Sequence, residues 1–288
     1  MDEFAGKVAV VTGAGSGMGK AFATRFAAEG MKVVAADIQR DALSQAVEEL
    51  RASGAVVLGV QTDVSSADSV HQLAEAASKE FGDVHLLCNN AGVEGYLDGA
   101  IWEATDKDWS WTVGVNFWSV VHGIRAFVPH MLEHGQPAHI VNTASMTAVV
   151  TATNMYGITK SAVLALSEVL AADLRQRKAR IGVTALCPGT IATNLFYGSR
   201  NRPEHLRNEE QTPGAQEGRE LRDRMHAVLA GGMSPAEVAD KLVAAIRGDA
   251  RYLLTDHEWD PQIIERHRAI LAGAVGPVVG SGTAEVTR

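Results

Sequence analysis

Short apolar runs alternate with longer amphipathic segments from residue 7 onward. The apolar runs have the length of buried strands, and the segments between them repeat their apolar positions with the period of a helix. The predicted elements, alternately strand and helix, are 7–12, 21–29, 32–37, 41–52, 56–60, 66–81 and 84–88. Apolar strands separated by helices are typical of a parallel sheet that is covered on both faces. We therefore predict an α/β fold, a doubly wound Rossmann-type sheet whose ligands lie beyond the carboxyl ends of its strands.

The second half of the chain continues the same alternation. A strand over 139–143 leads through a loop of small residues to a helix that carries Tyr156 and Lys160. A capping box that begins at Ser234 predicts the start of another helix. The later predicted elements are that helix, which runs to Arg247, a strand over 251–255 and a helix over 262–271.

We expect one dinucleotide-binding and catalytic domain over residues 1–258, followed by a C-terminal helix and tail over 259–288. A polar segment over 194–232 interrupts the alternation of strands and helices. Such a segment has the character of a substrate lid that closes over a bound ligand, and a disordered surface insertion is the alternative. Gly273 begins a stretch rich in Gly, Val and Ala, which we expect to be a loose tail.

Composition and charge narrow the class of protein. The 288 residues are 46% hydrophobic and 21% charged, as in ordinary globular proteins, and the net charge of -8 comes without a basic cluster. We therefore expect no nucleic acid as a partner. There is no signal-peptide pattern and no apolar run near the roughly 20 residues of a membrane span, so we expect a cytoplasmic protein without a membrane partner. Cys88 and Cys187 stand in apolar runs, which predicts buried thiols and neither a disulfide nor a metal site.

A glycine-rich turn follows the first predicted strand. The residues from Thr12 to Gly19 have the pattern T-G-x-x-x-G-x-G, which differs from the common G-x-G-x-x-G spacing. Glycines let a backbone approach a pyrophosphate closely, at the positive end of the helix that follows. The alternative is a tight turn without a ligand. A P-loop is excluded because no Gly-Lys is followed by Ser or Thr.

The second predicted strand ends at Asp37. A carboxylate there can accept hydrogen bonds from both ribose hydroxyls of an adenosine, and it would repel a 2′-phosphate. Asp37 therefore favours NAD over NADP as the coenzyme. Arg40 is a cation that could offset this preference, and a helix N-cap is the structural alternative for Asp37.

Tyr156 and Lys160 are four residues apart, so a helix places both side chains on one face. A phenol beside an ammonium is a candidate acid/base pair, because a nearby positive charge stabilises the phenolate. Ser145, on the loop before this helix, could hold a carbonyl or alcohol oxygen while the phenol exchanges its proton. Taken alone, the pair is equally compatible with a solvated helix surface.

The order of these motifs resembles the short-chain dehydrogenase/reductase family in its common single-domain branch. The resemblance covers residues 7–193 and becomes weaker as far as Tyr252. Six motifs carry it, in the family's order: Thr12 to Gly19, Asp63-Val64, Asn89 to Gly92, Asn116, the set of Ser145, Tyr156 and Lys160, and Pro188 to Thr193.

The resemblance implies a role for each motif. Tyr156 would be the general acid/base, Ser145 would orient the substrate oxygen, and Lys160 would bind the nicotinamide ribose and lower the phenol pKa. Asn116 would hold a water that connects Lys160 to solvent as a proton relay. The implied coenzyme contacts are Gly13, Ser16, Gly17, Met18, Gly19, Asp37, Asp63, Val64, Asn90, Ala91, Gly92, Tyr156, Lys160, Pro188, Gly189, Ile191 and Thr193. Ser145 and Tyr156 are 11 residues apart, against 12 or 13 in most of the family, so Thr147 is a conceivable substitute for Ser145.

We read the chain as an NAD-dependent alcohol dehydrogenase that interconverts a secondary alcohol and a ketone. The segments 201–204 and 252–259 also resemble the Cα-dehydrogenases of lignin-derived aryl ethers. Reduction of a 3-oxoacyl thioester and oxidation of a hydroxysteroid or terpenoid alcohol are alternatives within the family. A catalytically silent nucleotide-binding sensor or scaffold is the alternative from another class, although it would be expected to have lost Tyr156 or Lys160.

Four tryptophans lie on the approach to, and within, the predicted long helix that contains Asn116: Trp102, Trp109, Trp111 and Trp118. In the family this helix and the helix of Tyr156 pack against their copies in other subunits. The resemblance therefore implies a homotetramer or a homodimer, and the alternative is that these tryptophans belong to the core.

Overall fold

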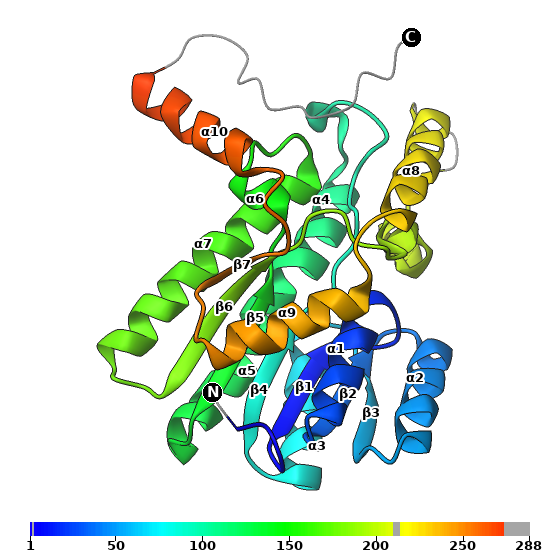
Figure 1. Cartoon of the computed structure of the whole chain (residues 1–288). Coiled ribbons are helices and arrows are strands. Elements are labelled where there is room, and N and C mark those ends of the chain that lie inside the picture. The colour runs from blue at the N-terminus through cyan, green and yellow to red at the C-terminus, as the bar shows by residue number, and fades with distance from the viewer. Residues whose placement is uncertain (2, 210–213, 274–288) are drawn as a thin grey trace.

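The sheet is parallel throughout, with the strand order β3-β2-β1-β4-β5-β6-β7 (Figure 1). The computed structural model describes residues 1, 3–209 and 214–273. Strand order reverses between β1 and β4, and the crevice at such a reversal is where open α/β sheets bind ligands. The predicted Rossmann-type fold is confirmed. The strands are β1 (Val8–Thr12), β2 (Lys32–Asp37), β3 (Val57–Gln61), β4 (Val84–Asn89), β5 (Ala138–Thr143), β6 (Ile181–Cys187) and β7 (Tyr252–Leu254).

Helices cover both faces of the sheet, with α1, α2 and α9 on one face and α3, α5 and α7 on the other. The α-helices are α1 (Gly17–Ala28), α2 (Arg40–Ala52), α3 (Ala67–Phe81), α4 (Asp106–Val113), α5 (Ser119–His134), α6 (Met146–Val149), α7 (Met155–Gln176), α8 (Ala215–Ala230), α9 (Pro235–Arg247) and α10 (Asp260–Ala272). The shorter turns are η1 (Ile101–Glu103), the π-helical turn η2 (Gly114–Trp118), η3 (Leu195–Asn201) and η4 (Glu204–Leu206).

Alternation along β1 builds both halves of the core. Ala9 and Val11 belong to the cluster that packs against α1 and α9, whereas Val8 and Val10 belong to the cluster against α3, α5 and α7. All four side chains are buried, and burying a valine contributes about 1.5–3 kcal/mol. This packing fixes the position of Thr12, the last residue of β1, at the edge of the sheet where the ligand crevice opens.

Two helices differ from the prediction. Helix α1 begins at Gly17, four residues before the predicted start, because the glycine-rich turn enters the helix directly. The predicted long helix around Asn116 consists of α4 and α5 joined by η2, in which one extra residue widens the turn. Such π-turns are frequent at functional sites. Of its tryptophans, Trp111 is buried, but Trp102 and Trp118 are exposed, so they are not core residues.

The polar segment after Thr193 folds into η3 and η4, and after the gap in the described residues it continues as α8. The capping box at Ser234 is present, since Ser234 Oγ accepts from the Glu237 backbone and the Glu237 carboxylate accepts from the Ser234 backbone. Helix α10 buries none of its side chains. The expected loose tail falls on 274–288, which lie outside the described residues.

Helix α7 has the length and apolar composition of a membrane span, contrary to the sequence expectation that no segment has both. Its setting is that of a core helix. One side packs against β5 and β6 and contributes Val163, Leu170 and Leu174 to the buried clusters. The same helix carries Tyr156 and Lys160, so its packing on the sheet determines where these two groups lie.

Candidate active site

The glycine-rich turn forms a backbone cradle between β1 and α1. Gly13 has φ +68°, and a Cβ added there would lie 3.0 Å from the Ala91 backbone. Ser16 is the N-cap of α1, but its side chain makes no capping hydrogen bond, and the first turn contains no acidic residue. The amide groups and the hydroxyl at this helix start are therefore available to an anion such as a pyrophosphate.

Asp37 is tied to this cradle. Its Oδ2 accepts a hydrogen bond from Gly15 N and its Oδ1 accepts one from Gln39 N, each at 2.9 Å. The N-cap of α2 is Gln39, so the interpretation of Asp37 as a helix cap is wrong. Arg40 donates to Gln61 Oε1 at 3.2 Å and is not among the residues that line the cavity described below, so it does not face Asp37 across that cavity.

Thr12 links the end of β1 to the end of β4, a role that the sequence analysis did not assign to it. Its Oγ1 accepts from the amides of Asn90 (2.9 Å) and Ala91 (3.1 Å), while Asn90 Nδ2 donates to the Thr12 carbonyl at 2.9 Å. Asp63 is similarly fixed, because its Oδ1 accepts from both the amide and the hydroxyl of Ser65. These contacts hold the loop after β4 against the cradle and leave Gly92 facing the cavity.

Ser145, Tyr156 and Lys160 come together at the end of β5. Ser145 is the N-cap of α6, and it is hydrogen-bonded to Tyr156. Although Ser145 and Tyr156 are only 11 residues apart, the short helix α6 between them still leaves their side chains together. Lys160 Nζ donates to the Thr143 carbonyl at 2.7 Å and lies 5.5 Å from the centroid of the Tyr156 ring.

Burial dominates the acid/base properties of this set. It raises the pKa of Tyr156 to about 12, and the hydrogen bond with Ser145 opposes only part of that rise. Burial also lowers the pKa of Lys160 to about 8. The net shift of the phenol pKa is thus upward, because loss of solvent outweighs the groups that stabilise the phenolate. That Lys160 lowers this pKa stays a prediction. At neutral pH the phenol keeps its proton.

Asn116 is fully buried in η2, and its side chain is already satisfied. Its Oδ1 accepts from Val93 N at 2.8 Å, and its Nδ2 donates to the Val93 carbonyl at 3.0 Å and to Thr159 Oγ1 at 3.1 Å. The Asn116 side chain thus holds the loop after β4 in place through its two hydrogen bonds with Val93. A Cβ added to Gly92 would lie 3.4 Å from both Asn116 Oδ1 and Lys160 Nζ, so Asn116 lies beside the ammonium as the family pattern implies.

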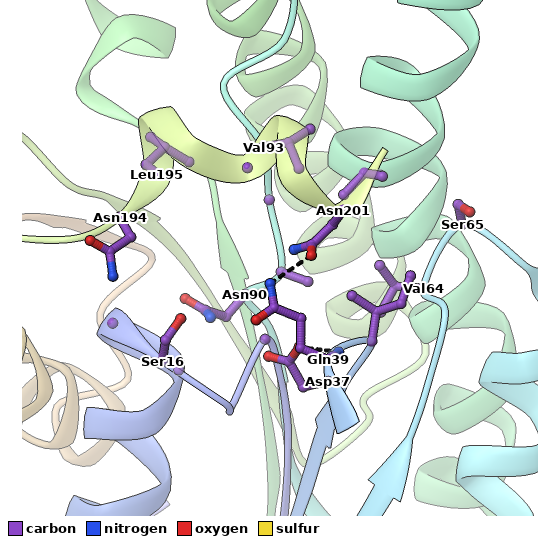
Figure 2. A pocket seen from close by; sticks show the side chains of 18 of the residues that line it. Ser16, Asp37, Gln39, Val64, Ser65, Asn90, Val93, Asn194, Leu195 and Asn201 are labelled. Carbon is purple, nitrogen blue, oxygen red and sulfur yellow. Dashed lines mark hydrogen bonds between the residues drawn. The ribbon is translucent and has the colours of Figure 1, made fainter. Parts of the chain in front are cut away.

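A cavity of about 200 Å³ connects these parts (Figure 2). Its lining includes fourteen of the residues named from the sequence: Gly13, Ser16, Gly17, Met18, Gly19, Asp37, Asp63, Val64, Asn90, Ala91, Gly92, Tyr156, Lys160 and Thr193. Five others are not among its lining residues: Asn116, Ser145, Pro188, Gly189 and Ile191. Gly189 N donates to Thr255 Oγ1 and Ile191 is buried in the core, so these two serve the strand end rather than the cavity wall.

Residues from α4 and from the predicted lid segment complete the wall, although the sequence analysis named none of them individually as a site residue. They include Trp111, Asn194, Leu195, Gly198, Arg200, Asn201 and Leu206. The cavity therefore has a carboxylate at the β2 end, a free helix N-terminus in the middle and the Tyr156–Lys160 pair at the β5 end. That order fits an extended dinucleotide, with its adenosine ribose at Asp37, its pyrophosphate at Ser16 and its redox-active ring beside Tyr156.

Comparisons with known proteins agree with this geometry. A family model described as short chain dehydrogenase matches residues 7–204. A 1-deoxy-11-beta-hydroxypentalenate dehydrogenase of Streptomyces exfoliatus is 43% identical over 194 residues, which are 67% of this chain and 70% of that protein. A C alpha-dehydrogenase of Sphingobium sp. is 30% identical and covers 96% of this chain and 89% of its own length.

A solved structure is similar over nearly the whole chain. It is a short chain dehydrogenase/reductase from Burkholderia phymatum in complex with NAD. It has a TM-score of 0.91 and 42% identity, and the alignment covers 96% of this chain and 99% of that one.

Proposed function

The chain belongs to the short-chain dehydrogenase family, and from this premise we propose that it is an NAD-dependent enzyme that interconverts a secondary alcohol and a ketone. One observation carries the proposal. Tyr156, hydrogen-bonded to Ser145 and one helical turn from Lys160, stands at the far end of a dinucleotide-shaped cavity.

The nicotinamide coenzyme, when bound, would accept or supply the hydride. The protein's part is to hold and move the proton. Ser145 positions the substrate oxygen beside the phenol of Tyr156, which donates its proton to a ketone oxygen or, as phenolate, takes the proton of an alcohol. Lys160, fixed by Thr143, is near enough to stabilise the phenolate that remains after donation. Asn116 holds the loop after β4 against Thr159 of α7, the residue before Lys160.

Asp37 supports NAD as the coenzyme. Asp37 lines the end of the cavity where an adenosine ribose fits, and its carboxylate can accept hydrogen bonds from the two ribose hydroxyls. The neighbouring structure that contains NAD supports the same choice. The segment 194–232 would be the substrate lid, since its described part already forms one wall of the cavity.

The relatives give a substrate class rather than a substrate. Two of them are named as dehydrogenases, one of a hydroxypentalenate and one of a C alpha position. Val93 and Leu195 add apolar surface to the cavity wall, which suits a bulky, largely apolar secondary alcohol. Reduction of a 3-oxoacyl thioester is the alternative, and a 29% identical neighbour is named as such a reductase.

Association and location belong to the same proposal. Trp118 of η2 is 46% exposed, and Ile158 and Val169 of α7 are 44% and 57% exposed, so apolar side chains face outward on elements that pack together. We expect these faces to be covered in a homotetramer or homodimer. Free buried thiols at Cys88 and Cys187 suit the cytoplasm.

The experiment is a coenzyme and alcohol screen. The purified protein is mixed with NAD or NADP and a panel of secondary alcohols that includes bulky alicyclic and benzylic members, and reduced coenzyme is followed by absorbance. The proposal expects turnover with NAD and at least one bulky secondary alcohol. Binding of NAD without turnover of any alcohol or ketone would favour a nucleotide-binding sensor instead.

A further inference from the structure

The cavity is bridged at its adenosine end by a contact between β2 and η3. Gln39, two residues beyond Asp37, contacts Arg200 and Asn201, which are 161 and 162 residues later in the chain. Figure 2 shows Gln39 and Asn201 directed at each other. With its amide oxygen toward η3, Gln39 accepts from Arg200 Nε and from Asn201 Nδ2, each at 2.8 Å. In the opposite orientation its Nε2 donates to Asn201 Oδ1 at 2.6 Å. A guanidinium can only donate, which favours the first arrangement.

The positive charge of Arg200 gives the contact a role besides holding the lid closed. The charged residues among the described lining are Asp37, Asp63, Lys160 and Arg200. Lys160 is at the Tyr156 end, so Arg200 is the cation of this lining at the adenosine end. A dinucleotide brings two negative phosphates into a space whose near wall carries two carboxylates. Arg200 is therefore placed to balance that charge.

Anchors on both sides hold the stretch of chain that contacts Gln39. Arg202 Nη1 donates to Asp108 Oδ1 at 2.7 Å, and its guanidinium lies 5.2 Å from the centre of the Trp111 ring. Ser199 N donates to Glu94 Oε1 at 3.1 Å. Because these anchors hold the backbone on both sides, the contact with Gln39 can break through side-chain movement alone.

From these contacts we infer that Gln39, Arg200 and Asn201 form a coenzyme clasp, a closure made by the substrate lid over the adenosine half of the dinucleotide. The clasp slows release of the coenzyme. Because the same lid also bounds the substrate site, a bound coenzyme favours the closed position of the lid at both sites. The inference rests on the proposed function, because it assumes that a dinucleotide occupies the cavity. The clasp adds Arg200 and Asn201 to the residues that bind the coenzyme, although both belong to the proposed substrate lid.

The test is the rate of NADH release, measured by stopped-flow fluorescence after displacement with excess NAD, with no substrate present. Gln39→Ala and Asn201→Ala should each release NADH about three- to tenfold faster, which corresponds to the loss of one or two hydrogen bonds. The double variant should release it little faster than either single variant, because both remove the same contact. Glu204→Ala, an exposed change on η4 outside the lining, is the matched control and should release NADH at the wild-type rate.

Coenzyme fragments distinguish a clasp from a general weakening of the fold. AMP is the adenosine half of the dinucleotide, so its affinity should fall by a similar factor in the clasp variants. Reduced nicotinamide mononucleotide lies at the Tyr156 end, and its affinity should stay unchanged. Equal losses for both fragments would show that the variants disturb the whole cavity and would overturn the inference.

The two proposals fail in different ways. If NADH binds the wild type but leaves all four proteins at the same rate, or if the two single effects multiply in the double variant, the clasp is refuted and the dehydrogenase assignment stands. If NADH does not bind the wild type at all, the proposed function fails and the clasp fails with it. Arg200→Ala, which should also accelerate release, checks the charge argument separately.

Discussion

Lys160 donates a hydrogen bond of 2.7 Å from its Nζ to the backbone carbonyl of Thr143, the last residue of β5. This contact ties the first turns of α7 to the sheet at the point where Ser145 begins α6. It fixes the ammonium beside the Tyr156 ring without pairing it with a carboxylate. The positive charge of Lys160 therefore lies where it can stabilise a Tyr156 phenolate. Burying this ammonium, in a residue that is only 2% exposed, is itself unfavourable.

That burial predicts a pH dependence of stability. The pKa of Lys160 falls from 10.5 to about 8 in the folded chain. Between these values the unfolded chain binds more protons at Lys160 than the folded one does, so Lys160 alone should raise the free energy of unfolding from about pH 8 to about pH 10, by up to about 3 kcal/mol. The buried thiols of Cys88 and Cys187, whose pKa values burial raises, oppose this rise above about pH 9 in the wild type and in a Lys160 variant alike. Lys160→Met should lack this rise. Chemical unfolding of both proteins without coenzyme measures it, and parallel profiles would show that Lys160 is not the group responsible.

Tyr156→Phe should remove most turnover and leave coenzyme binding nearly intact. The change deletes only the hydroxyl that exchanges the proton, and loss of a general acid/base costs roughly 10²–10⁴-fold in rate. The affinity for NADH should stay within about threefold, because the ring remains against Lys160. Steady-state rates and fluorescence titration give the two numbers. A variant that keeps more than about a third of the wild-type rate would mean that the proton passes through another group.

Asp37→Ala should reduce the preference for NAD over NADP, both by weakening the binding of NAD and by strengthening that of NADP. It removes acceptors of the ribose hydroxyls, each worth about 0.5–1.5 kcal/mol or somewhat more for a charged acceptor, and it removes a charge that would repel a 2′-phosphate. Arg200, rather than Arg40, is the cation in the cavity lining that would then face the phosphate. The ratio of kcat/KM for NAD and NADP in both proteins decides the matter. A wild type that already prefers NADP, or an unchanged ratio in the variant, would contradict the role of Asp37.

Arg202→Ala should loosen the lid. Although burial opposes it, hydrogen bonds from Thr105, Arg202 and Asn208 hold the pKa of Asp108 below its ordinary value. Removing the guanidinium leaves a charge on a buried side chain with two neutral partners, which should cost about 2 kcal/mol in unfolding and raise the KM of the coenzyme. Arg219→Ala, an exposed change on α8, is the control. If both variants unfold alike, the Arg202–Asp108 pair is not what anchors the lid.

The parts of the site that follow from short spacing could be read from the sequence. Tyr156 and Lys160 share a helix face, and the glycine turn needs only the residues between β1 and α1 to form its cradle. Asp37 was placed correctly as well, because it ends a strand whose apolar run is plain. In each case the local period or the end of an element determines the position of the side chain.

Long-range contacts and solvation could not be read in this way. Nothing near Gln39 in the sequence indicates that Asn201 will reach it, and the pattern pointed to Arg40 as the relevant cation although that side chain turns to Gln61. The upward shift of the Tyr156 pKa by burial could not be read either, because a sequence shows which charges are near but not how much water the fold removes. The π-turn at Asn116 has no periodic signature that separates it from one long helix.

The most direct measurement of the central claim follows the hydride itself. A turned-over secondary alcohol is prepared with deuterium on its carbinol carbon and incubated with the protein and NAD, with Tyr156→Phe as the comparison. Mass spectrometry of the coenzyme should show one deuterium in each NADH formed, together with one ketone per NADH, and almost none of either with the variant. NADH that forms without deuterium, or a ketone that forms without NADH, would contradict the account.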